Sequence, residues 1–128
     1  MEFIPSSKFD LNACEVLQKT SPEVLRAEIR SLLVWVQDIN WPVALPVMNA
    51  LKLQGSYLVA PISEVLRGND ESWKYNVLTY FLPSLESSVV KELQPEILRI
   101  AMSPTKPEIR EQVNEAASQL INALKANW

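Results

Sequence analysis

The sequence predicts an all-α protein, on three observations. Apolar residues recur every three or four positions along most of the 128 residues, which is the spacing of a helix buried on one face. Prolines and polar residues gather near the ends of these segments, and no segment alternates apolar and polar residues over the length of a strand. Hydrophobic residues make up 48% and charged residues 21%, so we expect a single folded domain over residues 1–128.

Four helices are expected in the first half of the chain. Ser21 suits the cap of the second helix and Pro22 its first position, so this pair both ends the first helix and begins the second. Asn40 is placed to cap the third helix, and Gly55 and Gly68 terminate the third and the fourth. The expected ranges are residues 10–19, 22–37, 41–53 and 57–67.

Four more helices are expected in the second half. Either Asn69 or Asp70 can cap the first of them, Pro83 ends it, and Pro95 begins the third. Residues 103–107 form the clearest loop, and the apolar residues from Ile109 onward follow one stripe along the last helix. The expected ranges are residues 71–82, 86–93, 95–102 and 107–126.

Three of the helix junctions resemble one another, which indicates an internal repeat. In each, a helix ends, a short polar break follows, and a large apolar residue opens the next helix. Trp41, Trp73 and Ile109 take the equivalent place, at spacings of 32 and 36 residues. Such a period predicts an α-solenoid, because one helical hairpin cannot bury its apolar stripe alone but stacked hairpins bury each other's. We expect about three hairpins in a right-handed superhelix.

The repeat resembles HEAT repeats, which have an apolar first helix, a turn with an aspartate, and then an apolar residue beside a basic one. Here these are Asp70 and the pair Trp73-Lys74, whereas Pro42 replaces the basic residue in the first unit. Two motifs, D-x-N-W-P-V-A from Asp38 and D-E-x-W-K-Y-x-V-L from Asp70, also resemble a small family of uncharacterised bacterial helical domains. These resemblances imply a HEAT-like fold and a bacterial cytosolic setting, and they imply no chemistry.

The composition argues against an enzyme. There is no histidine, which removes the commonest general base and metal ligand, and only two glycines are available for phosphate-binding loops. Cys14 is the only cysteine, and we expect it to be a small buried side chain. Glu108, Glu111 and Glu115 have the spacing of di-iron carboxylates but lack the Glu-x-x-His motif, so we interpret them as a solvated helix face. We expect no cofactor and no metal.

The charge and hydropathy of the sequence limit where the protein can reside and what it can bind. The net charge of −3 and the scattered Lys and Arg residues disfavour wholesale binding of phosphates. Residues 1–10 lack the apolar run of a signal peptide, and the densest apolar stretch, residues 32–36, is far too short to cross a bilayer. We therefore expect a cytoplasmic protein that binds neither nucleic acid nor membrane.

The candidate binding residues lie at the first two junctions. Tryptophan and tyrosine dominate interaction hot spots, so the aromatic residues could anchor a partner. Equally, Trp73 could fill the gap between neighbouring hairpins and Lys74 could simply bind the acidic turn. If the hairpins stack in register, the two junctions lie side by side and form an acidic strip flanked by tryptophans. Such a strip suits a basic protein partner. The residues are Asp38, Asn40, Trp41, Asp70, Glu71, Trp73, Lys74 and Tyr75.

Three functions follow as hypotheses. The first is a non-catalytic protein–protein interaction module, and more narrowly an immunity protein that neutralises a cationic toxin. The second is a nucleic-acid binder or DNA glycosylase of the HEAT-like kind, which requires a contiguous positive patch. The third is a homodimer that uses the tryptophan-bearing edge as its own interface. The partner's identity and the oligomeric state are not determined by these patterns.

Overall fold

The computed structural model of the protein describes residues 2–125 and confirms the all-α class, since within that range the chain forms helices and turns but no strand. The α-helices are α1 (Leu11–Lys19), α2 (Pro22–Leu25), α3 (Ile29–Leu33), α4 (Ala44–Leu51), α5 (Val59–Arg67), α6 (Glu71–Asn76), α7 (Ser87–Glu92), α8 (Gln94–Met102), α9 (Lys106–Arg110) and α10 (Val113–Leu124). Tighter 3₁₀ turns join several of them, at Arg26–Glu28, Val34–Val36, Lys52–Leu58 and Leu82–Ser84, and Val77–Phe81 continues α6 as a π-helical turn.

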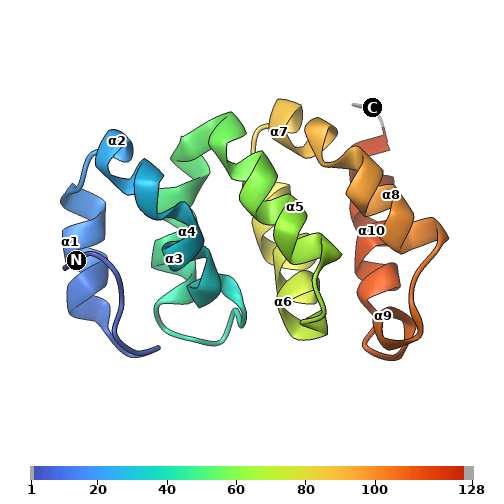
Figure 1. The fold of residues 1–128 in the computed structure, drawn as a ribbon, viewed down its shortest axis with the longest axis horizontal. Coiled ribbons are helices and arrows are strands. Elements are labelled where there is room, and N and C mark those ends of the chain that lie inside the picture. Colours follow the sequence, from blue (N-terminus) through green and yellow to red (C-terminus); the bar gives the residue numbers. More distant parts are fainter. Residues whose placement is uncertain (1, 126–128) are drawn as a thin grey trace.

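Pairs of helices follow one another in chain order along the long axis of the molecule, from α1 at one end to α8 and α10 at the other (Figure 1). Helix α4 packs against α1 and α3, α5 packs against α3, α6 and α8, and α10 packs against α8 and α6. The connections α3–α4, α5–α6 and α8–α9 all turn at the lower edge of Figure 1. Three turns that are far apart in the sequence therefore lie along one edge.

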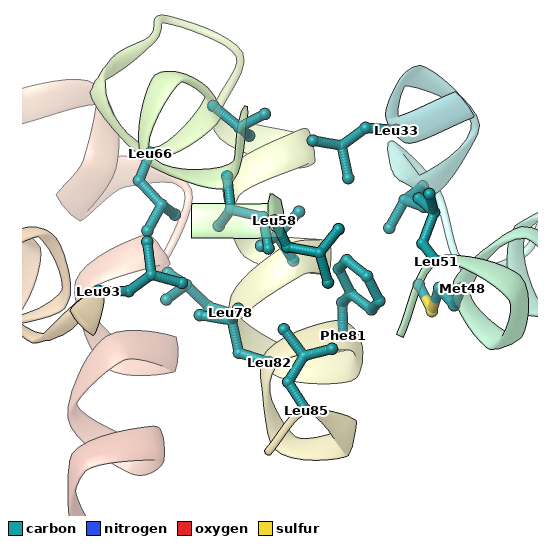
Figure 2. Packing of buried hydrophobic residues seen from close by; sticks show 14 of the residues in the cluster. Leu33, Met48, Leu51, Leu58, Leu66, Leu78, Phe81, Leu82, Leu85 and Leu93 are labelled. Carbon is teal, nitrogen blue, oxygen red and sulfur yellow. The ribbon is translucent and has the colours of Figure 1, made fainter. Parts of the chain in front are cut away.

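One apolar cluster runs through this row (Figure 2). Cys14 is also buried, as expected, and burial raises the pKa of its thiol. Burying these side chains is the main gain in folding, at about 25 cal/mol per Å² of apolar surface. The largest fully buried side chains are Phe81, Leu17, Leu32, Leu33, Leu51, Leu58, Ile62, Leu66, Leu78, Leu82, Leu93 and Ile97.

Helix α4 begins three residues later than the sequence predicts. Asn40 and Trp41 lie in the preceding turn, and the first regular helical bond runs from the Val47 amide to the Val43 carbonyl, at 3.1 Å. The expected start at residue 41 was wrong because Pro46 has no N–H to donate to the carbonyl four residues earlier. Segment 22–37 is helical as expected, but α and 3₁₀ turns alternate along it.

The last predicted helix is broken in two. Gln112 adopts left-handed backbone angles, φ 63° and ψ 23°, between α9 and α10. In an unbroken helix Glu108 and Val113 would point about 140° apart, whereas the break lets both be fully buried. Ile109 consequently turns outward and is 54% exposed, so its expected equivalence with the two tryptophans was wrong. The predicted end at Ala126 lies outside the described residues.

Replacing Gln112 by glycine should stabilise the protein by about 0.5–1 kcal/mol. The left-handed conformation costs a residue with a Cβ about 1–2 kcal/mol. Glycine avoids this cost in the folded protein, but its greater freedom in the unfolded chain cancels part of the gain in stability. The measurement is the urea midpoint of Q112G against wild type. The control is E111G, which should lose stability because Glu111 has a negative φ of −96°. Equal losses in both variants would show that Gln112 is not strained.

None of the helices within residues 2–125 has both the length and the hydropathy needed to cross a membrane.

Candidate functional site

The turn between α3 and α4, which we call the first turn, holds three of the predicted site residues in a compact hydrogen-bonded loop. Asp38 accepts a hydrogen bond from the Asn40 amide through Oδ1, at 2.8 Å, and from the Trp41 amide through its carbonyl, at 3.1 Å. Asn40 is exposed, and the half-buried Trp41 ring meets the ring of Trp35 edge-on, with centroids 5.9 Å apart. This turn therefore presents an acidic side chain and a supported aromatic ring together.

The turn between α5 and α6, which we call the second turn, is held beside the first by a side chain of α6. Buried Asn76 accepts a hydrogen bond from the Ile39 amide of the first turn, at 2.9 Å, and donates to the Ser72 carbonyl, at 2.8 Å. The amide side chain thus satisfies a loop N–H that would otherwise lose its hydrogen bond to water. The two predicted halves of the site are consequently neighbours in the structure.

Asp70 caps α6, as predicted, by accepting a hydrogen bond from the Trp73 amide at 3.0 Å. Its side chain is exposed, and only Oδ1 is engaged in this cap. Trp73 is half-buried against the apolar cluster, and its Nε1 is buried with no hydrogen-bond partner among the described residues. Tyr75 is likewise half-buried against the cluster. Trp73 and Tyr75 therefore combine a packing role with partial access from outside.

Lys74 does not face a partner. It is only 2% exposed, and its Nζ lies 2.9 Å from Glu71 Oε1 and 2.9 Å from Glu108 Oε2. A buried ammonium needs such carboxylates because losing its hydration is costly. The position of Lys74 agrees with the interpretation that it binds the acidic turn. The prediction that its side chain contacts a partner directly was wrong, because the side chain is buried.

The turn that follows α8, which we call the third turn, contains Glu108, and this residue is the centre of the ion cluster. It is fully buried, which corrects the expectation of a solvated face for this residue, whereas Glu111 and Glu115 are exposed as expected. Arg99 donates to both of its oxygens at 2.8 Å, and the Thr105 amide donates to Oε1 at 2.8 Å, while Thr105 Oγ1 accepts from the Glu108 amide. Burial acts to raise the pKa of Glu108, but the hydrogen bonds from Arg99, Thr105 and Lys74 lower it from 4.5 to about 2.

The second and third turns share the same kind of helix cap. Asp70 and Thr105 both accept from the amide three residues later, so they are equivalent and lie 35 residues apart. By this alignment Trp73 corresponds to Glu108 rather than to Ile109. We call the aligned turns, residues 37–43, 68–73 and 103–108, the turn edge; it lies along the bottom of Figure 1. Its third turn carries a buried ion cluster in place of a tryptophan.

A groove adjoins the turn edge between α3 and α5, with a volume of about 320 Å³. We call it the α3–α5 groove. One side is crossed by the ion pair of Arg30 with Glu64, in which Arg30 Nε lies 3.0 Å from Glu64 Oε1 and lowers the pKa of that carboxyl. The groove ends at Asn69 and Asp70 of the second turn. Its apolar walls are formed by Leu33, Val34, Pro61, Val65 and Trp73.

A second, more polar depression of about 720 Å³ lies between the last two hairpins. Its charged groups are matched with one another: Arg67 Nε lies 2.8 Å from Glu96 Oε1, and the rest belong to the Glu108 cluster. Among residues 2–125 there is no group of three histidine, cysteine or acidic side chains placed to hold a metal ion. The polar depression is therefore an internal ion-pair seam rather than an open charged site.

Three residues of this region were not predicted from the sequence as part of the site: Asn76, Arg99 and Glu108. Glu108 could have been found, because Thr105 and Glu108 form a capping box, whose S/T-x-x-E pattern is visible in the sequence. Asn76 and Arg99 carry no local signal. Their partners Ile39 and Glu108 lie 37 and 9 residues away, and only folding brings them together.

Fold and site together define a small all-helical protein whose three turns share one edge, two of them bearing an aspartate and a tryptophan. A family model described as a domain of unknown function, DUF5071, matches residues 3–121. The chain therefore belongs to the DUF5071 family, which confirms the expectation of an uncharacterised family. No curated protein matches it.

Proposed function

We propose that the protein is a non-catalytic protein-binding module built as a HEAT-like solenoid of about three hairpins. The chain-order row of helices and the contacts between neighbouring pairs support the solenoid. So do the ion pairs of Arg30 with Glu64 and of Arg67 with Glu96, which link the first helices of successive hairpins across 34 and 29 residues. Such a scaffold gives the turns fixed relative positions, as a preorganised binding surface requires.

The turn edge carries this proposal. Asp38 and Asp70 lie on neighbouring turns, and neither has a cationic side chain within ion-pair distance among residues 2–125. Trp41 and Trp73 lie beside them with part of each ring accessible. Unpaired carboxylates next to rigid aromatic rings match a basic surface, because the rings exclude water and the charges steer association.

We propose further that the partner is a cationic toxin and that the protein is a cytoplasmic bacterial immunity protein. The net charge of −3 and the small size support this narrower function. Nucleic-acid binding has less support, because the net charge is −3 and four of the twelve Lys and Arg residues, Arg30, Arg67, Arg99 and Lys74, are each engaged by a carboxylate.

Neutralising the turn edge should abolish capture of a basic partner. Asp→Asn keeps the hydrogen-bonding oxygen of each turn and removes its charge, so the variant D38N/D70N should fold like wild type. We expect a basic protein from a lysate of the native host to be retained by the immobilised wild-type chain and lost by this variant. With that protein purified, the affinity should fall at least about 10-fold, since two desolvated charges are lost.

The matched control is E86Q/E92Q, which removes two exposed carboxylates at α7, on the edge of Figure 1 opposite the turn edge. It should retain the partner and show the same dissociation constant as wild type. Equal retention by D38N/D70N and wild type would refute the proposed edge.

A further inference from the structure

We propose that the α3–α5 groove receives an arginine side chain, flanked by apolar residues, from the protein partner. This inference rests on the proposed function and names the chemistry that the same edge recognises. The groove opens beside Asp70 and Trp73, so it is continuous with the turn edge. At about 320 Å³ it lies at the small end of ligand pockets, which suits one long side chain and part of its neighbour.

The walls of the groove match the stem of such a side chain. Val65 and Leu33, which are 8% and 2% exposed, line it together with Pro61 and Val34. Trp73 adds an aromatic side chain to the lining. The aliphatic carbons of arginine bury well against apolar walls, and its guanidinium stacks favourably on an indole ring.

The charges around the groove match the head of that side chain. Three charged residues line it, and two of them, Arg30 and Glu64, neutralise each other. Asp70 is left with a net negative charge, because its Oδ1 caps α6 while no cation pairs with it in the described part of the chain. Guanidinium prefers a carboxylate for directional, charge-assisted hydrogen bonds, so Asp70 selects a cationic head at the groove mouth.

The test uses the full chain and two tripeptides that differ only in charge. Acetyl-Leu-Arg-Leu-amide and its citrulline analogue have nearly the same shape, and only the first is cationic. Each is titrated into ¹⁵N-labelled protein at low salt, and the indole signal of Trp73 and the amide signals of Val65 and Asn69 are followed. We expect saturable shifts at these positions, with the citrulline peptide about 3- to 10-fold weaker.

Three variants localise the effect. D70N should reduce the preference for arginine over citrulline by about 2- to 5-fold, the loss expected for one exposed ion pair. E92Q changes an exposed carboxylate of α7, outside both the groove and the turn edge, and should leave the binding of both peptides unchanged. V34F should fill the groove and weaken both peptides alike, with its fold verified by thermal unfolding; should V34F not fold, the comparison of D70N with E92Q still decides.

The inference is overturned if the two peptides bind equally, if E92Q and D70N act alike, or if the shifts lie outside the groove. Groove signals that shift with protein concentration alone would identify a second copy of the chain as the occupant and would also overturn it. If the peptides fail while the basic partner is still captured and is lost by D38N/D70N, only this inference falls. If that capture fails as well, the proposed function falls with it.

Discussion

Replacing Glu108 by leucine should lower the free energy of unfolding by about 3–5 kcal/mol, the cost of leaving a buried charge without its partner. In E108L, Lys74 Nζ keeps only Glu71, and Arg99 loses both of its bonds to the carboxylate. The Thr105 amide also loses its side-chain acceptor. Urea unfolding followed by far-UV circular dichroism measures the change directly.

Two controls separate the charge effect from general damage to the last hairpin. E111Q changes an exposed carboxylate three residues away and should stay within about 0.5 kcal/mol of wild type. The triple variant E71Q/K74M/E108L removes the Lys74 ammonium and both of its carboxylates, and it should recover about 1–2 kcal/mol relative to E108L because none of these three groups is left as a buried charge without a partner. An E108L variant as stable as wild type would show that the cluster contributes nothing.

The same carboxylate gives the protein a defined acid sensitivity. The pKa of Glu108 is about 2 in the folded protein and 4.5 in its ordinary state, so the unfolded chain binds the proton more readily. Its stabilising contribution is therefore complete above about pH 4.5 and is lost as the pH falls through 2. E108Q should lack this contribution, so its unfolding midpoint should fall less steeply than that of wild type between pH 4.5 and 2.

The helical elements were predictable because their signals are local. The apolar spacing located α1, α5 and α8 within about two residues, and Asp70 is one of the two residues that the sequence offered as the cap of α6. Each of these depends on residues within one helical turn of one another. Local physics also explains the late start of α4, since the missing N–H of Pro46 is visible in the sequence.

The candidate site was predictable only in part because its geometry is tertiary. The sequence identified Asp38, Trp41, Asp70 and Trp73, which lie on the turn edge, but it also placed Lys74 on that edge. Whether a lysine points outward or into an ion cluster depends on a carboxylate 34 residues away, and no local pattern carries that information. The same applies to the break at Gln112, which depends on burying Glu108 and Val113 together.

Replacing Phe81 by alanine should lower the free energy of unfolding by about 3–5 kcal/mol through the cavity it leaves. Phe81 is fully buried, and Figure 2 shows its ring among the side chains of the cluster, between Leu58 and Leu82 on one side and Met48 and Leu51 on the other. It lies on the π-helical turn that follows α6. These neighbours come from successive helix pairs, so the ring joins the middle of the row to its first half.

The matched control is the preceding residue. Tyr80 is 44% exposed on the same turn, and Y80A removes a similar aromatic ring with the same change in local helix propensity. Its loss should stay near 1 kcal/mol, because the exposed part of the ring was never removed from water. A benzene-like ligand should partly restore the stability of F81A, since an apolar cavity of that kind stays dry and admits it. Equal losses in F81A and Y80A would mean that the helices are not held together by this shared cluster, because the buried ring would then contribute no more than an exposed one.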